Sequence, residues 1–317
     1  MSGEHHAHGA ATEYAGSLAK WAWLSIAAAV ATIGLKTGAY YITGSVGLLS
    51  DALESVVNLA AAILALIALT VAARPPDERH HYGHAKAEYF SAGAEGIMIL
   101  FAAALIIVSA VDRLFNPQPL ESLGLGLFIT LVATAVNGFV GLVILRAGKR
   151  HRSITLVADG KHLLTDVWTS AGVLIGVGLV ALTGWQPLDS IVAIAVALNI
   201  LWTGFTLIRQ SGRGLMDHAL PAESEAAVLT VIERFTSGDS PVQIHQVRMR
   251  EAGRDRFVQM HVLVPGDWTV SRGHDVVEEI EAAVRAELVG AHVDTHLEPL
   301  EDPRAYESTV GGLAVTE

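Results

Sequence analysis

The chain has 317 residues, of which 51% are hydrophobic and 17% charged, and it contains no cysteine. The lack of cysteine excludes disulfide bonds, thiolate metal ligands and cysteine nucleophiles, and the net charge of −11 argues against binding to nucleic acid. Residues 1–214 carry 13 basic and 13 acidic side chains, whereas residues 215–317 carry 8 and 19. A single soluble domain would not divide in this way, so we expect two unlike parts.

Six long apolar segments recur through the first 214 residues, and each has about the 20 residues needed to cross a hydrocarbon core. They cover approximately 18–42, 46–73, 89–111, 123–145, 156–183 and 187–208. The pattern predicts a six-helix transmembrane domain over residues 18–214, preceded by a tail over residues 1–17 that contains His5, His6 and His8. The alternative is a large soluble helical bundle, but so many segments of this length in about 200 residues argue against it.

Basic residues accompany only one set of the connecting segments. This set contains Lys20, Arg74, Arg79, Lys86, Arg146, Lys149, Arg150, Arg152, Arg209 and Arg213, whereas the opposite loops contain only Arg113. By the positive-inside rule we expect both termini, and with them the acidic last third, in the cytoplasm. The sequence therefore predicts a multi-pass protein of the cell (inner) membrane.

Ionisable side chains within a spanning helix are costly and mark functional pathways. The second segment contains Glu54 and Asn58, and the fifth contains His162 and Asp166. Within each pair the spacing is i, i+4, which places both side chains on one helix face. Two such pairs facing each other supply four ligands, the number that a tetrahedral divalent cation needs. Asp159 precedes His162 by three residues, and we expect it to contact the metal ligands without binding the metal itself.

The two segments read GSVGLLSDALESVVN and ADGKHLLTD, and the loop after the second segment reads DERHHYGHAKAE. Found together and in this order, they resemble motifs of the cation diffusion facilitator family of metal–proton antiporters. The resemblance covers about residues 15–300. It implies six membrane spans followed by a cytoplasmic domain, a homodimer, and the export of divalent cations.

The resemblance places the transport site on Glu54, Asn58, His162 and Asp166. In familiar zinc carriers of the family the pair in the second span is Asp or His followed by Asp, so Glu54 and Asn58 depart from the pattern. Two carboxylates, an imidazole and an amide form a harder donor set, which favours manganese, iron or cobalt without excluding zinc. Asn58 is equally typical of a hydrogen bond between helices. Asp51, one turn before Glu54, is an alternative fourth ligand or a contact near the helix end.

The loop between the second and third spans predicts a second metal site. By the resemblance its ligands are Asp77, His80 and His84, and the alternative is a solvated basic loop that merely contains histidines. The resemblance also implies a salt bridge between Lys86 and Asp217 that holds the hinge of a dimer. Because a surface ion pair contributes little stability, any importance of this pair would come from its position.

The last third predicts a small α+β domain over residues 215–300. A helix, two strands, a helix and a strand are expected over residues 221–235, 243–251, 256–264, 271–288 and 292–298. Apolar residues alternate in the second strand, as a half-buried strand requires. This αββαβ order matches the ferredoxin-like, metallochaperone-like module of the family, and residues 301–317 are expected to form a disordered tail.

Three histidines of this domain, His245, His261 and His296, lie on strands that can adjoin in one sheet, and Glu298 follows two residues after His296 on the same face. By the resemblance, these residues and His274 bind regulatory metal at a dimer interface. The alternative is that some of them are ordinary strand or surface histidines.

We therefore expect a homodimer in the lipid bilayer that exports a divalent cation in exchange for protons. Zinc is the first candidate, and manganese, iron, cobalt and cadmium are the others. The metal is both the substrate and the expected regulator, and no cofactor is required. His162 binds metal only when its imidazole is neutral, so a proton and a metal ion compete for it.

Two other classes of protein remain as alternatives. One is a metal sensor that signals through the acidic domain without transport. The other is a membrane metal-dependent hydrolase, which would require an activating base as in HExxH. The nearest segment, His80-His81-Tyr82-Gly83-His84, has no Glu after its first histidine and contains a glycine, so we do not expect an enzyme.

Overall fold

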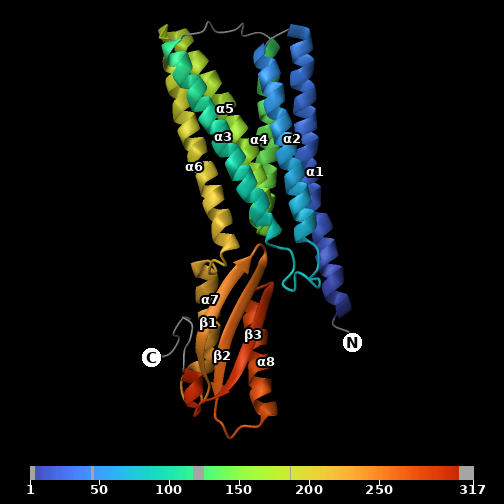
Figure 1. The fold of residues 1–317 in the computed structure, drawn as a ribbon, viewed down its shortest axis with the longest axis vertical. Coiled ribbons are helices and arrows are strands. Elements are labelled where there is room, and N and C mark those ends of the chain that lie inside the picture. The colour runs from blue at the N-terminus through green and yellow to red at the C-terminus, as the bar shows by residue number, and fades with distance from the viewer. Residues whose placement is uncertain (1–3, 44–45, 117–124, 186, 307–317) are drawn as a thin grey trace. The chain divides into compact units, whose positions relative to one another are not determined.

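The computed structural model describes residues 4–43, 46–116, 125–185 and 187–306 (Figure 1). The chain divides into two compact units at Arg213 and Gly214. We call them the helical unit and the C-terminal unit and describe each by itself. The boundary lies at the end of the apolar segments, as the composition predicts.

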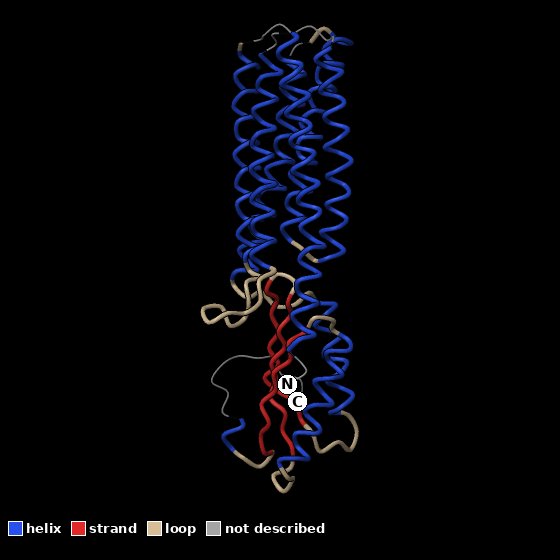
Figure 2. The backbone as a smooth tube through the Cα atoms, turned by 90° about the vertical axis from the view of Figure 1, so that its right-hand side faces the viewer, coloured by secondary structure: helices blue, strands red, loops and turns tan. Residues whose placement is uncertain are grey.

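The helical unit consists of six long helices that run side by side (Figure 2). They are α1 (Glu4–Thr43), α2 (Val46–Ala72), α3 (Ala87–Phe115), α4 (Leu125–His151), α5 (Ile154–Thr183) and α6 (Pro187–Leu215). Each of the six expected spans is therefore largely helical over its described residues. Helix α1 begins at Glu4, so the backbone of the expected tail is already helical from this residue. The side chains of residues 1–17 lie outside the described part.

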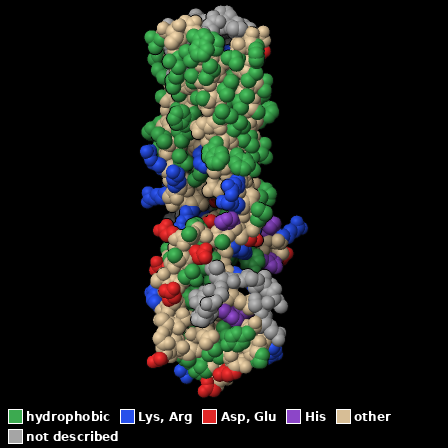
Figure 3. Space-filling model, turned by 90° about the vertical axis from the view of Figure 1, so that its left-hand side faces the viewer, with side chains coloured by type: hydrophobic (Ala, Val, Ile, Leu, Met, Phe, Trp, Pro, Cys, Tyr) green, Lys and Arg blue, Asp and Glu red, His purple; other side chains and the backbone are tan. Residues whose placement is uncertain are grey.

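Four of these helices contain described segments long and apolar enough to cross a membrane: Leu18–Gly38, Ala87–Phe115, Phe128–His151 and Ser190–Leu215. Helices α2 and α5 have 27 and 30 residues, which also suffices for a span, but part of their side chains are not described. Large apolar side chains face outward on the helices, and Figure 3 shows them covering the helical unit, with Lys and Arg gathered at one end. This surface suits a bilayer.

Glycines allow the helix backbones to approach closely. A Cβ atom at Gly160 of α5 would lie 2.8 Å from the backbone nitrogen of Leu145 in α4. Likewise, a Cβ atom at Gly96 of α3 would lie 3.1 Å from the carbonyl oxygen of Gly204 in α6. Small residues at such crossings are typical of membrane helices, where dispersion contacts drive association. The close approach of α4 to α5 sets the distance between polar groups on these two helices.

The C-terminal unit has the predicted αββαβ order. Its elements are α7 (Ala222–Thr236), β1 (Gln243–Ala252), β2 (Asp255–Val264), α8 (Val270–Glu287), β3 (Ala291–Pro299) and the short 3₁₀ helix η1 (Pro303–Tyr306). The sheet order is β1-β2-β3, in which β1 and β2 are antiparallel and β2 and β3 are parallel. Gly253, with φ of 61°, makes the tight turn between β1 and β2. The parallel pair requires a crossover, which α8 supplies.

The core of this unit lies between the sheet and the two helices. Val228 and Ile232 of α7 and Ile280 of α8 are fully buried against Val258 and Met260 of β2. Val258 and Met260 follow the alternation expected for the second strand, and Val228 and Ile232, four residues apart, share one face of α7. The opposite face of the sheet is therefore left for polar side chains.

A bulge in β1 decides which side chains reach that polar face. The register changes between His245, opposite His261, and Arg248, opposite Gln259. Gln246 has a φ of 50°, and Ile244 and Val247 are both buried although they are three residues apart. A bulge inserts one extra residue and so shifts the alternation of faces.

Residues 301–306 were expected in a disordered tail, and this expectation is wrong. Ala305 is buried, and the Tyr306 hydroxyl donates a hydrogen bond of 3.0 Å to the Leu300 carbonyl oxygen. The Arg304 guanidinium bonds to Asp302 and holds the pKa of that carboxyl at about 2. These contacts extend the fold to Tyr306. Residues 307–317 lie outside the described part.

Candidate metal sites

Helices α2 and α5 bring three of the four expected transport ligands together. Asn58 and His162 are buried, and His162 Nε2 lies 2.9 Å from Asn58 Oδ1. Asn58 Nδ2 donates a hydrogen bond to Asp166 Oδ2. Asn58 of α2 therefore faces the i, i+4 pair of α5, and its amide bridges the imidazole and the carboxylate. The side chains of Glu54 and Asp51 lie outside the described residues, so their roles stay predictions.

A residue that sequence reasoning missed completes this cluster. Asn137 of α4 is 3% exposed, and its Nδ2 donates a hydrogen bond of 3.2 Å to Asp166 Oδ2. The available signal was a lone amide within an apolar span, in the segment TAVNGFV. Asn137 lies opposite α5 because Gly138 and Gly141 next to it let α4 approach Val167 and Leu163.

Two buried carboxylates lie elsewhere in the same unit. Asp159, 1% exposed, accepts a hydrogen bond of 3.0 Å from Ser25 Oγ of α1. Glu95 of α3 is fully buried, accepts 3.3 Å from Ser91 Oγ, and is close enough to Asp159 for their charges to interact. Each keeps one buried oxygen without a hydrogen-bond partner among the described residues. Asp159 was expected as a supporting residue, whereas Glu95, an acid in an apolar span, was missed.

A third buried acid fixes the start of α5. Glu88, in the first turn of α3, accepts hydrogen bonds from Ser153 Oγ and, at 3.4 Å, from the Thr155 amide. Ser153 Oγ in turn accepts a bond of 3.3 Å from the Leu156 amide. The free amide groups at the N-terminus of a helix favour such an anion. Glu88 thus ties α3 to the helix that carries His162 and Asp166.

The loop between α2 and α3 assembles its predicted ligands. Asp77 Oδ1 lies 3.2 Å from His80 Nδ1, and Asp77 Oδ2 lies 3.3 Å from His84 Nε2. One ligand atom from each residue falls within 4.8 Å of the others, so the three can hold one metal ion. The Arg79 amide donates to Asp77 Oδ1, and this bond lowers the pKa of the Asp77 carboxyl. The Asp77 carboxylate therefore stays ionised, and able to bind a cation, at a lower pH than an ordinary Asp carboxylate.

Two further residues of this region have separate surroundings. His81 Nε2 bonds to the Glu78 carbonyl oxygen at 3.1 Å rather than joining the three ligands. Asp217 accepts a hydrogen bond of 2.9 Å from Arg250 Nη1 within the C-terminal unit. The expected pair of Asp217 with Lys86 would join the two units, and it stays a prediction.

The C-terminal unit gathers a third cluster across its three strands. His245 is paired with His261, and His261 with His296, in the register of the sheet. Glu298 Oε2 lies 3.2 Å from His245 Nε2 and 3.1 Å from His261 Nδ1. Its other oxygen, Oε1, lies 3.6 Å from His296 Nε2. His245, His261 and Glu298 present ligand atoms within 4.8 Å of one another, so the expected alignment of these residues is found.

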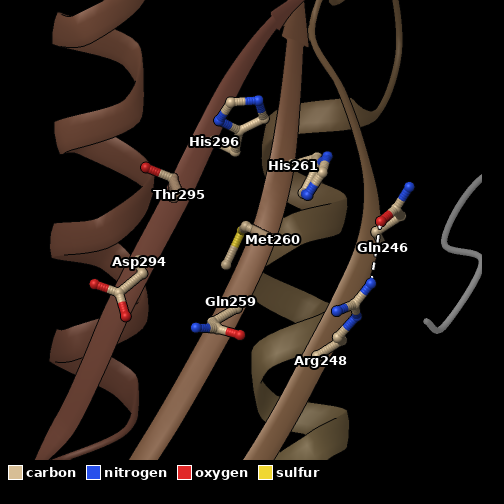
Figure 4. Close-up of a pocket in the computed structure, with 8 residues that line it drawn as sticks. All are labelled: Gln246, Arg248, Gln259, Met260, His261, Asp294, Thr295 and His296. Carbon is tan, nitrogen blue, oxygen red and sulfur yellow. Dashed lines mark hydrogen bonds between the residues drawn. The ribbon is translucent and has the colours of Figure 1, made fainter. Parts of the chain in front are cut away.

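His274 does not join this cluster, and His296, although it lies near Glu298, is also outside the group of close ligand atoms. His274 lies exposed near the start of α8, outside the group of close ligand atoms found among the described residues. His261 and His296 also line one end of a hollow on the polar face of the sheet, with Gln259 and Arg248 toward its other end (Figure 4). Arg248 donates to Gln246 Oε1 there at 3.3 Å. The hollow thus continues the polar surface beside the cluster of His245, His261 and Glu298.

Comparisons with known proteins agree with these two units. Residues 22–216 match the cation efflux transmembrane domain, and residues 220–300 match the cytoplasmic domain of cation efflux proteins. The uncharacterized transporter sll1263 of Synechocystis sp. is 52% identical over 287 residues, which cover 90% of this chain and 92% of that protein. The cation-efflux pump FieF of Klebsiella pneumoniae is 28% identical over 277 residues, covering 86% and 90%.

Among solved structures, the metal-bound C-terminal domain of the CzcD transporter from Thermotoga maritima matches 26% of this chain and 92% of that chain, with 26% identity and a TM-score of 0.23. The family assignment rests on the two domain matches, which together span most of the sequence and agree with the observed division of the fold. The chain therefore belongs to the cation efflux, or cation diffusion facilitator, family of metal cation transporters, and it is not an enzyme.

Proposed function

We propose that this protein exports divalent transition-metal cations, zinc among them, from the cytoplasm in exchange for protons. The observation that carries the proposal is the cluster that buried Asn58 and His162 form with the partly buried Asp166 between α2 and α5. A nitrogen donor and two kinds of oxygen donor meet there inside a membrane domain. Such groups are costly in a bilayer unless they serve a pathway.

The exchange for protons follows from the chemistry of the imidazole. When both ring nitrogens of His162 carry a proton, Nε2 donates to Asn58 Oδ1 and cannot bind a cation; when the Nε2 proton is lost, the neutral ring can bind the cation through Nε2. Metal binding from the cytoplasm therefore releases a proton, and protonation on the opposite side expels the metal. Alternating exposure of the cluster to the two sides would couple the two flows.

We further propose that the protein works as a homodimer in the cell (inner) membrane with both termini in the cytoplasm. The match to the cytoplasmic domain of cation efflux proteins and the basic last turns of α4 and α6 support this arrangement. Within it, the loop cluster of Asp77, His80 and His84 and the cluster around Glu298 both face the cytoplasm. These two clusters then sense or gather the same cation that the transport site carries.

Asp166→Asn is the variant that tests the proposal most directly. In sealed proteoliposomes we expect uptake of zinc driven by a proton gradient to fall by about tenfold or more, because the charged ligand becomes a neutral amide. Asp112→Asn is the matched control, since Asp112 is exposed near the end of α3 and its carboxylate bonds to Asn116 within the described part of the chain. Unchanged uptake in Asp166→Asn would refute the assignment. Wild-type vesicles that bind metal but carry none would instead favour a sensor without transport.

A further inference from the structure

Asn137 lies at the transport cluster, and only one of its two side-chain polar atoms has a hydrogen-bond partner among the described residues. Its Nδ2 donates to Asp166 Oδ2, but its Oδ1 is buried and has no hydrogen-bond partner among the described residues. A buried carbonyl oxygen without a partner costs free energy, about 1–3 kcal/mol in typical proteins. An oxygen of this kind, beside a carboxylate at a cation site, points to a ligand that satisfies it when the site is loaded.

The hydrogen bonds at Asp166 indicate what changes on loading. Asn58 and Asn137, from two different helices, both donate their amide nitrogens to the same oxygen, Asp166 Oδ2. A cation bound to this oxygen repels amide N–H groups and attracts amide oxygens. Rotation of an amide by half a turn exchanges its nitrogen and its oxygen in nearly the same space. Both amides can therefore turn from donors to Asp166 into oxygen ligands of the cation.

We propose that Asn137 is an additional oxygen ligand of the transported cation, and that it shifts the preference of the site toward oxygen-preferring ions such as Mn²⁺. The inference rests on the proposed transport function. With Asn137, the described ligands comprise one nitrogen from His162 and oxygens from Asn58, Asp166 and Asn137. Manganese accepts higher coordination numbers with mainly oxygen ligands, whereas zinc is satisfied by four ligands and prefers nitrogen and sulfur.

The test compares Mn²⁺ with Zn²⁺ in proteoliposomes that contain the full chain. Asn137→Ala removes the oxygen, and we expect the ratio of kcat/KM for Mn²⁺ over Zn²⁺ to fall by about tenfold. Asn137→Asp keeps an oxygen in the same place, so this ratio should stay at or above that of the wild type. Asn199→Ala is the matched control, because Asn199 is exposed on α6.

The outcomes separate a ligand from a residue that merely positions Asp166. Equal loss of Mn²⁺ and Zn²⁺ transport in Asn137→Ala, or no loss, would overturn the proposal. If that variant does not fold, the Asn137→Asp ratio decides, and a value below wild type contradicts the proposal. Wild-type vesicles that carry neither ion would instead disprove the transport function. Competition between Mn²⁺ and Zn²⁺ for the purified protein, with His80→Ala and His261→Ala removing ligands of the other clusters, would then still measure the contribution of Asn137.

Discussion

The carboxylates within the helical unit differ in how many hydrogen bonds offset the free-energy cost of burying them. Asp166 receives two amide donors, and Glu88 receives a hydroxyl and a backbone amide. Glu95, in contrast, receives only the hydroxyl of Ser91 among the described residues, next to the charge of Asp159. A buried carboxylate with so few donors opposes folding. Replacing the Glu95 carboxylate by a neutral group should therefore raise the stability of the protein.

We predict that Glu95→Gln stabilises the protein, by about 1–3 kcal/mol, because a neutral amide of the same shape is cheaper to bury beside Asp159. Thermal unfolding of the purified protein in detergent, without added metal, measures the effect. Glu223→Gln, at an exposed position at the start of α7, is the control and should change little. A lower unfolding temperature for Glu95→Gln would show that the carboxylate has a compensating partner.

The residues that sequence reasoning found and those that it missed differ in the kind of contact involved. His162 and Asp166 share one helix face, so their spacing of four residues predicted their proximity. Asn137 meets Asp166 across two helices, and such a contact depends on packing that no local pattern contains. The signal for Glu95 was stronger, since any acid within an apolar span is notable, but its neighbour Asp159 comes from another helix.

Helices and strands were predicted well where periodicity alone decides them. The elements of the C-terminal unit end within two residues of their expected bounds, because alternation in β2 and the helical spacing of apolar residues in α7 are local properties. The bulge at Gln246 was not predicted, since it depends on how β1 pairs with β2. Yet the bulge keeps both Ile244 and Val247 in the core while His245 reaches Glu298.

Packing between α4 and α5 provides a test at the scale of elements. In Gly160→Ala the new Cβ would lie 2.8 Å from the backbone nitrogen of Leu145, so the two helices must separate. We expect a loss of about 1–3 kcal/mol of stability and a marked loss of transport, since Asn137 and Asp166 lie on these two helices. Thermal unfolding and vesicle uptake measure the two effects.

The matched control for this variant is Gly34→Ala in α1. A Cβ at Gly34 would meet no heavy atom of another described segment within 4 Å, so the substitution should be neutral or slightly stabilising through helix propensity. Comparable losses in both variants would mean that glycine flexibility, and not the close approach of α4 to α5, explains the effect.

At the scale of the whole molecule, the uneven distribution of charge predicts an electrostatic effect of metal binding on the C-terminal unit. The helical part through residue 214 is electrically neutral by formal charge, while residues 215–317 carry the entire net charge of −11. In a homodimer, two such domains repel each other, although salt screens this repulsion beyond about 8 Å. Divalent cations bound around Glu298, beside His245 and His261, would reduce the negative charge. Metal binding should therefore draw the two domains together.

Distance measurement between the two copies tests this prediction on the full chain. Because the sequence has no cysteine, Val289→Cys, at a position 76% exposed, offers one labelling site per copy for paired spin labels. We expect zinc to shorten and narrow the distance distribution, and His261→Ala to weaken this response. His218→Ala should leave it intact, since the His218 imidazole bonds to the neighbouring Ala219 carbonyl oxygen and not to the ligands around Glu298 among the described residues. Distances that ignore zinc at neutral pH would exclude the C-terminal cluster as a switch, and the charge asymmetry would then serve only to concentrate cations near the membrane.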